Sequence, residues 1–312
     1  MDHDIKAAWL RAIGTPGKYL FERKLKKVRE IGHPAFDGEL FLQACGPDSF
    51  QKLLKLFPKK IAGKTPAVAV PFYHPDGMVG FDLATRNPLL KYQGIAMAFD
   101  LVRRGFVTAV ADAYPFHFSG DDPEVNQAEF RCDFSRYEDF QSWKTAGEKL
   151  RREYPDWTGI GKLVSDTTLL LDALSEDSRV DSARIGIAGH SLGGKIAFYT
   201  GCLDDRVKAI LASDFGIGWD QTNWNDIWYW GEKAAGMKKA GFEHSQLLTL
   251  SGAKPFMLLA GQYDNEESGE IMRRAKGYGD SPGKLVLLNH ASGHRPPASA
   301  LEEGYRFLER WV

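Results

Sequence analysis

The clearest structural signal in the chain is Ala183-Arg184-Ile185-Gly186-Ile187-Ala188-Gly189-His190-Ser191-Leu192-Gly193-Gly194. The first half is apolar in the manner of a buried strand, and a helical pattern begins at Lys195. Ser191 therefore lies where a strand turns sharply into a helix, and the flanking glycines leave room for neighbouring backbone. The Leu192 amide, at the start of the helix, points toward any oxyanion formed beside this serine. The stretch predicts a nucleophilic serine.

Length and composition allow a single globular domain with a large core. With 312 residues, 43% of them hydrophobic, the chain can bury a large core as one domain with insertions. The formal net charge of −1 gives no surface suited to nucleic acid. The basic cluster of residues 23–29 is expected to be the exposed face of an N-terminal helix.

The cysteines and the N-terminal residues indicate the cellular compartment in which the protein is found. Cys45, Cys132 and Cys202 are odd in number and lack metal-ligand spacing, so we expect reduced thiols and no metal site. The first residues lack a signal-peptide pattern, and no apolar run reaches the roughly 18 residues of a membrane span. We expect a soluble, cytoplasmic protein that binds no membrane.

Strand-like and helical patterns alternate through most of the chain. Residues 1–31 resemble a helix broken near 14–17. Strands are expected at 36–44, 50–57, 66–72, 106–111, 184–188, 207–212, 255–260 and 284–288, and helices at 96–104, 161–174 and 194–202. Residues 51–56 fit a helix nearly as well as a strand. This pattern predicts a mostly parallel, eight-stranded sheet covered by helices on both faces. We expect residues 1–60 to be an extension packed on the sheet and residues 61–312 to be the catalytic domain.

Two connections are long enough to cover the crevice at the carboxyl ends of the strands. They span about residues 114–158 and 213–253. In the second, Trp219 and Trp224 lie among Asn and Asp residues, which suits a carbohydrate or aromatic ester in the substrate pocket. Packing of these tryptophans on the core is the alternative.

A serine hydroxyl needs a base, usually a histidine oriented by a carboxylate. His294 follows the last expected strand after a short loop, which is the place for that base. His290 competes with it but is expected to be buried and hydrogen-bonded. His190 adjoins the serine in sequence, so we expect it to support the pocket.

The orienting carboxylate should follow a strand between the serine and the histidine. Asp264, after the strand 255–260, fits best. Asp214, Glu266 and Glu267 remain alternatives, and capping of the next helix is the structural role open to Asp264. The second oxyanion donor is expected to be the backbone amide of Tyr73, after the strand 66–72.

On these residues the chain resembles the α/β-hydrolase superfamily, and within it the dienelactone-hydrolase-like and acetyl-xylan-esterase-like serine esterases. Prolyl-oligopeptidase catalytic domains are more distant relatives. The resemblance covers residues 60–312 and implies a Ser191–His294–Asp264 triad, an ester substrate and no cofactor. It is carried by the segments 181–186, 189–194, 203–209, 261–264 and 293–297. Dienelactone hydrolases proper use a cysteine nucleophile, so the serine argues against that activity.

The sequence therefore predicts a serine hydrolase that cleaves carboxylic esters through an acyl-enzyme. A serine peptidase with the same triad, or a non-catalytic binding protein on the same fold, are the alternatives. The N-terminal region is a candidate either for a contact in a homo-oligomer or for a cover over the sheet.

Overall fold

The computed structural model describes residues 2–14, 21–46, 49–119, 139–279 and 283–312. Ten strands in these ranges form one sheet, in the order β1-β2-β3-β5-β4-β7-β8-β9-β10, with β6 paired to β3. The six strands from β5 to β10 along this order are parallel, and β1, β2 and β3 run antiparallel to their neighbours. The expected mostly parallel sheet is confirmed, with ten strands in the described residues where eight are expected.

The strands are β1 (Leu25–His33), β2 (Phe36–Gly46), β3 (Ser49–Pro58), β4 (Thr65–Ala69), β5 (Val107–Ala111), β6 (Phe118–Ser119), β7 (Val180–His190), β8 (Val207–Ser213), β9 (Phe256–Ala260) and β10 (Leu285–Asn289). The helices are α1 (Asp2–Ile13), α2 (Pro75–Val79), α3 (Met97–Arg103), α4 (Phe140–Glu153), α5 (Gly159–Ser175), α6 (Leu192–Leu203), α7 (Lys233–Lys239), α8 (His244–Leu250), α9 (Glu266–Arg273) and α10 (Ala298–Trp311). All eight expected strands are present, and β1 and β6 are additional.

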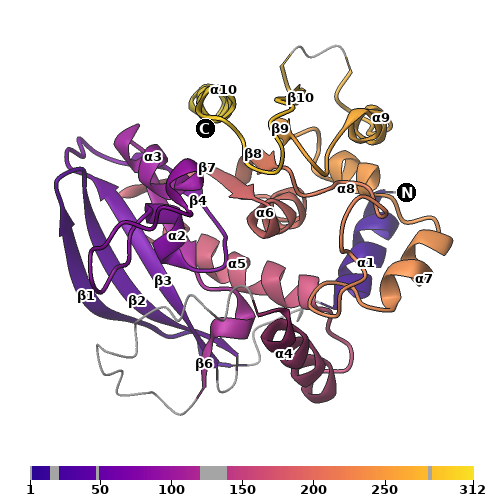
Figure 1. The fold of residues 1–312 in the computed structure, drawn as a ribbon, viewed down its shortest axis with the longest axis horizontal. Coiled ribbons are helices and arrows are strands. Elements are labelled where there is room, and N and C mark those ends of the chain that lie inside the picture. Colours follow the sequence, from indigo (N-terminus) through magenta and orange to yellow (C-terminus); the bar gives the residue numbers. More distant parts are fainter. Residues whose placement is uncertain (1, 15–20, 47–48, 120–138, 280–282) are drawn as a thin grey trace.

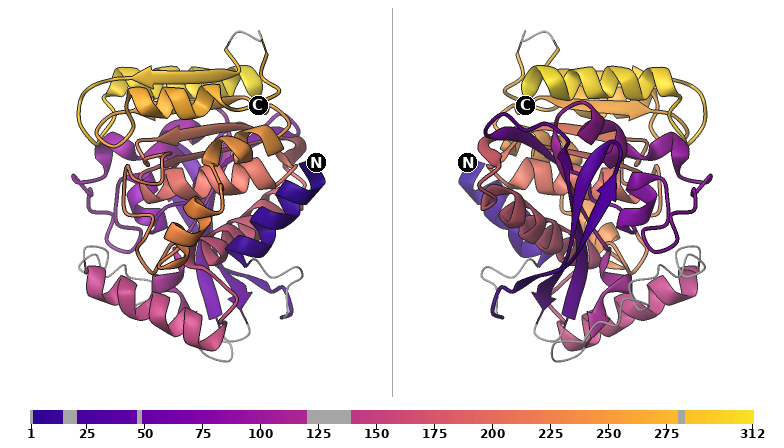
Figure 2. Two further views of the ribbon diagram at one scale, coloured as in Figure 1. Left: turned by 90° about the vertical axis from the view of Figure 1, so that its right-hand side faces the viewer. Right: turned by 90° about the vertical axis from the view of Figure 1, so that its left-hand side faces the viewer.

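Helices cover both faces of the sheet because the strands are apolar on both sides (Figures 1 and 2). Side chains alternate along β3: Leu53 and Phe57 join the core under α5 and α6, whereas Leu54 and Leu56 join the core under α2, α3 and α10. Two separate hydrophobic cores therefore hold the sheet between its helical layers.

The N-terminal region differs from the expectation of a broken helix. Among the residues of this region that the structure describes, α1 is the one helix. The basic cluster lies at the start of β1, an edge strand paired with β2 through a bulge between Lys27 and Arg29. Charged side chains suit an exposed sheet edge, because they discourage pairing with other chains. Since β3 pairs with β5, residues 25–58 belong to the same sheet as the strands after residue 60.

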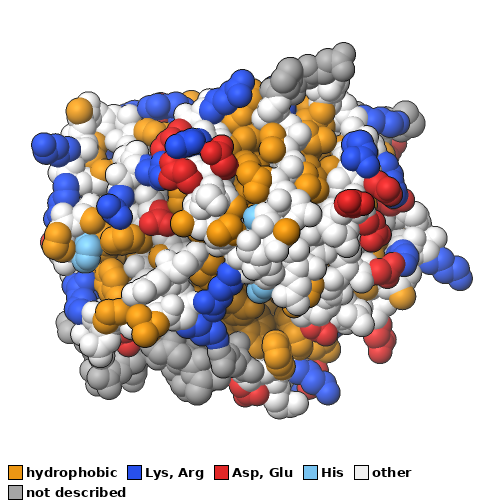
Figure 3. All heavy atoms as spheres, turned by 45° about the horizontal axis from the view of Figure 1, so that its top comes forward, with side chains coloured by type: hydrophobic (Ala, Val, Ile, Leu, Met, Phe, Trp, Pro, Cys, Tyr) orange, Lys and Arg blue, Asp and Glu red, His pale blue; other side chains and the backbone are white. Residues whose placement is uncertain are grey.

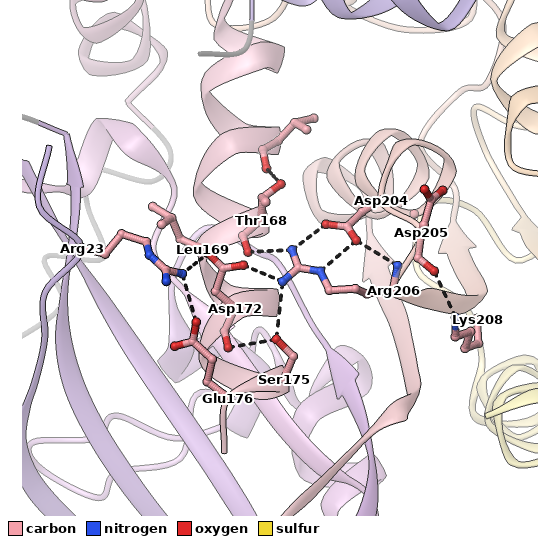
Figure 4. Close-up of polar contacts among 12 residues, drawn as sticks. Arg23, Thr168, Leu169, Asp172, Ser175, Glu176, Asp204, Asp205, Arg206 and Lys208 are labelled. Atoms are coloured by element: carbon pink, nitrogen blue, oxygen red, sulfur yellow. Dashed lines mark hydrogen bonds and ion pairs between the residues drawn. The ribbon is translucent and has the colours of Figure 1, made fainter. Parts of the chain in front are cut away.

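An ion-pair network ties the start of this region to the helical layer (Figure 4). Arg23 contacts Asp172 of α5 at 2.8 Å, and the other oxygen of Asp172 lies 2.5 Å from Arg206. Arg206 also binds Asp204 at 2.7 Å, so the connection between α6 and β8 joins the same network. No helix in the described part of the chain is long and apolar enough to cross a membrane.

Candidate active site

The turn between β7 and α6 has the strained backbone that the sequence predicts. Ser191 adopts φ 57° and ψ −116°, a conformation that costs a non-glycine residue about 1–3 kcal/mol. A Cβ on Gly189 would lie 2.1 Å from the carbonyl oxygen of Gly193, and a Cβ on Gly193 would lie 2.2 Å from that of Pro71. Only glycine fits at these two positions, because the backbone segments pack directly against one another.

The carboxylate beside His294 belongs to Asp214, not to Asp264. Asp214 Oδ2 lies 2.6 Å from His294 Nδ1, and the Asp214 side chain is fully buried. Asp214 follows the end of β8, where its own φ of 40° turns the side chain toward the histidine. The expected His294–Asp264 pair is therefore corrected to His294–Asp214, which was one of the alternatives.

Asp264 instead holds the backbone that follows Asp214. Its Oδ2 accepts hydrogen bonds from the amides of Phe215 and Gly216, both at 2.8 Å. Its Oδ1 accepts from the Ile217 amide at 2.8 Å and from the Ser268 hydroxyl at 2.9 Å. With its two oxygens taken by four donors, Asp264 fixes a loop and does not reach the histidine.

The two carboxylates brace each other's loops. Asp214 Oδ1 accepts from the amides of Gly261, Tyr263 and Asp264, at 3.1, 2.9 and 3.1 Å. The acid after β8 thus binds the loop after β9, and the acid after β9 binds the loop after β8. Each acid can reach the other's loop because β8 and β9 are adjacent parallel strands that end at the same edge of the sheet.

Their surroundings move the two pKa values in opposite directions. Burial raises the pKa of Asp214, but the hydrogen bonds from His294 and from the backbone outweigh it, and the net pKa lies below the usual value. For Asp264 burial dominates, and its pKa is raised. Asp214 is accordingly the carboxylate better suited to stay ionised beside a histidine that gains a proton.

Glu266 and Glu267, the remaining alternatives for the acid, lie in the first turn of α9 and are exposed. Neither forms a hydrogen bond to His294, whose Nδ1 is occupied by Asp214. Acidic side chains in a first helical turn interact favourably with the helix dipole, which gives both a structural role.

Tyr73 lies beside Ser191 through its side chain, whereas the sequence pointed to its backbone amide. Tyr73 and Ser191 line the same pocket, and burial, opposed by the interaction with Ser191, raises the pKa of the Tyr73 phenol to about 12. The hydroxyl therefore stays protonated at neutral pH and can donate. Leu192 begins α6, so its amide has no carbonyl acceptor within the helix.

Two further histidines lie near the site. The His190 ring packs against that of His294 with centroids 4.6 Å apart, and its Nδ1 lies 3.1 Å from Ser213 Oγ. Burial, followed by the charge of His294, lowers the pKa of His190 to about 3, so this ring is neutral and adds no repulsion when His294 is protonated. His290 instead accepts a hydrogen bond from the Ser292 amide at 3.2 Å.

A pocket of about 480 Å³ contains these groups. Ser191, His294 and His190 line it together with Tyr73. The sequence did not single out the remaining lining residues, which are Phe72, Lys91, Tyr92, Ile95, Phe140 and Arg295. Arg295 could have been suspected, because it directly follows His294, but the segment around Lys91 and Tyr92 carries no comparable signal. Ser191 Oγ makes no hydrogen bond to His294 in this structure, a bond that often forms only when substrate is present.

Trp219 and Trp224 do not line this pocket, which corrects the expectation that they contact substrate. Trp224 is fully buried and donates to the Gly216 carbonyl at 2.8 Å. Trp219 donates to the Phe242 carbonyl at 2.7 Å and stacks on Trp9 of α1. The tryptophans therefore pack in the core, which was the alternative to a place in the substrate pocket. Trp9 of α1 packs against them. Residues 120–138 of the other long connection, including Cys132, lie outside the described residues.

The sheet order and the serine turn are those of the α/β-hydrolase fold. No family model matches the chain. The chain is 28% identical over 166 residues to YtaP of Bacillus subtilis (strain 168), a protein named as a hydrolase. That match spans 49% of this chain and 54% of the relative, so it covers about half the length of each.

Solved structures share the fold over nearly the whole chain. A glucuronoyl esterase from Solibacter usitatus matches with a TM-score of 0.69 and 15% identity, covering 99% of this chain and 91% of that one. A glucuronoyl esterase from Teredinibacter turnerae T7901 matches with a TM-score of 0.69 and 19% identity, covering 99% and 84%. An acetyl xylan esterase from Paenibacillus sp. R4 matches with a TM-score of 0.59 and 16% identity, covering 100% and 94%.

Proposed function

We propose that the protein is a serine hydrolase that cleaves carboxylic esters through an acyl-enzyme, without a cofactor. The observation that carries this proposal is the His294–Asp214 pair, whose histidine lines the same pocket as Ser191. Ser191 itself lies on a strained turn at the start of a helix. A nucleophile, a base and an orienting acid are the minimum set for this chemistry.

The first half of the reaction forms the acyl-enzyme. Because the ionised Asp214 accepts a hydrogen bond from the N–H at His294 Nδ1, the other nitrogen, Nε2, is unprotonated and can take a proton from Ser191. Ser191 Oγ then attacks the ester carbonyl carbon. His294 returns the proton to the alcohol oxygen as the bond from carbon to that oxygen breaks.

The second half repeats these steps with water. His294 takes a proton from the water, the hydroxide attacks the acyl carbon, and the proton returns to Ser191 as the acid leaves. Asp214 stabilises the imidazolium in both halves. The Leu192 amide and the Tyr73 hydroxyl are the donors for the oxyanion in each tetrahedral intermediate.

We propose a carbohydrate ester or a small aromatic ester as the substrate class. Support comes from the names of the similar structures, which are glucuronoyl and acetyl xylan esterases. The aromatic side chains of Tyr73, Tyr92 and Phe140 in the pocket wall are suited to contact a sugar ring or an aryl group.

A panel of acetyl, feruloyl and methyl glucuronoyl esters, with p-nitrophenyl acetate as a general substrate, tests the function. We expect hydrolysis of at least p-nitrophenyl acetate by the wild type, and a loss of about 10⁴-fold or more in kcat for Ser191→Ala with unchanged circular dichroism. Full activity of the Ser191→Ala variant would refute the proposal.

We also propose a cytoplasmic location. Cys45 and Cys202 are buried free thiols, and burial raises the pKa of each to about 12. Unpaired thiols of this kind are typical of proteins from reducing compartments.

A further inference from the structure

Two cations line the pocket that contains the catalytic groups. Lys91, in the connection between α2 and α3, and Arg295, directly after His294, line the same pocket as Ser191. The side chains of both are exposed at its mouth. No Asp or Glu is among the described residues that line this pocket. On the face of the molecule drawn in Figure 3, Lys and Arg side chains lie beside histidine and hydrophobic side chains.

The two cations lie close enough to influence each other. Burial and then the positive charge of Arg295 lower the pKa of Lys91. Lys91 also lies near the Tyr92 ring, 5.8 Å from its centroid. Arg295 forms no ion pair with any residue in the described part of the chain. Like charges repel at a pocket mouth, and an anion placed there is attracted by both.

The rest of the pocket lining is largely apolar. Phe72, Tyr92, Ile95 and Phe140 form an apolar wall, while the oxyanion donors lie at Ser191. An ester could therefore bury an apolar portion in the pocket and keep a charged group near Lys91 and Arg295. The two buried acids Asp214 and Asp264 do not compete for this group, because both are fully buried and engaged in hydrogen bonds of their own.

We propose that the preferred substrates are esters bearing a free carboxylate, which Lys91 and Arg295 bind at the mouth of the pocket. This inference rests on the proposed ester hydrolase function and narrows its substrate class. The carboxylate can belong to the acyl part or to the alcohol part, and matched substrates distinguish these two sources.

The test compares an ester that bears a free carboxylate with a neutral ester of otherwise similar structure. For the acyl part, mono-p-nitrophenyl glutarate is compared with p-nitrophenyl butyrate. For the alcohol part, 4-acetoxybenzoate is compared with its methyl ester. We expect kcat/KM to favour the anionic member of at least one pair by on the order of tenfold at low salt, and the preference to shrink toward 0.5 M NaCl.

Substitutions of Lys91 and Arg295 test whether these two cations cause the preference for the anionic ester. The ratio of kcat/KM for the anionic over the neutral ester should fall severalfold in Lys91→Gln and in Arg295→Gln, and should invert in Arg295→Glu. Lys239→Gln removes an exposed charge in α7, outside the pocket, and should leave the ratio as in the wild type. Using a ratio cancels any effect on His294 that both substrates share.

Two results would overturn the inference. One is equal kcat/KM for both members of both pairs, with neutral esters still hydrolysed, which leaves the hydrolase function standing. The other is an anionic preference that persists unchanged in both Gln variants. If the wild type hydrolyses no ester in either pair, the hydrolase function itself fails, and the inference falls with it.

Discussion

Replacing each of the two buried acids by asparagine should separate catalysis from structure. In Asp214→Asn, three backbone amides hold the oxygen at the Oδ1 position, so the new NH2 group must face His294 Nδ1. His294 then carries its proton on Nε2 and cannot accept one from Ser191. We expect kcat to fall on the order of 10³- to 10⁴-fold. Because the three hydrogen bonds from the backbone amides to the remaining oxygen are kept, the free energy of unfolding should drop by only about 1–2 kcal/mol.

Asp264→Asn should show the reverse pattern. Both of its oxygens accept two hydrogen bonds, and an NH2 group facing amide or hydroxyl donors would lose about two of the four. Hydrogen bonds to a buried carboxylate are worth about 1.5–3 kcal/mol each, so unfolding free energy should fall by about 3–5 kcal/mol. At temperatures where the variant is folded, kcat should fall less than about tenfold, through imperfect positioning of Asp214.

The assay is p-nitrophenyl acetate hydrolysis together with urea unfolding for both variants. Glu266→Gln and Glu267→Gln serve as controls, since both carboxylates are exposed in α9 and should affect neither measurement. The reasoning is refuted if folded Asp264→Asn loses as much kcat as Asp214→Asn, or if Asp214→Asn retains wild-type activity.

Three further predictions concern the oxyanion donor, a buried lysine and the serine turn. Tyr73→Phe should lower kcat by on the order of 10²-fold with KM changed severalfold at most, and an unchanged kcat would exclude the hydroxyl as donor. Burial lowers the pKa of Lys195 to about 7, so the unfolded state binds more protons between pH 7 and 10. Wild-type stability relative to Lys195→Met should therefore rise across this range, by at most about 5 kcal/mol, in urea titrations at each pH. Gly193→Ala places a Cβ 2.2 Å from the Pro71 carbonyl oxygen, so its free energy of unfolding in urea should fall by about 4 kcal/mol or more. Gly269→Ala is the control, because its Cβ would have no contact under 3.4 Å, and its free energy of unfolding should change by less than about 1 kcal/mol.

The central part of the fold is readable from the sequence because its signals are local. Buried parallel strands are continuous apolar runs, and the glycines around Ser191 mark the close backbone contacts of a strand-to-helix turn. The edge strand β1 was not readable, because Leu25, Val28 and Ile31 are spaced by three, as in a helix. The bulge after Lys27 changes the strand register there, and periodicity in one strand cannot reveal it.

The nucleophile and the base were predicted for their places after strands, but the acid was not. Asp214 and Asp264 follow adjacent parallel strands at the same sheet edge, so position alone allows either to reach His294. The choice depends on the positive φ of Asp214 and on the amides that capture Asp264, which are tertiary features. Similarly, nothing in the pattern around Trp219 distinguishes a pocket wall from a core contact with Trp9.

The most direct test of the site is covalent labelling of the folded protein with a fluorophosphonate, followed by intact mass measurement and peptide mapping. The Ser191–His294–Asp214 arrangement predicts one label per chain, located on Ser191, and labelling slowed on the order of 10³-fold or more in Asp214→Asn but not in Glu266→Gln. Labelling at a different serine, or ester hydrolysis by a protein whose Ser191 stays unlabelled, would contradict it.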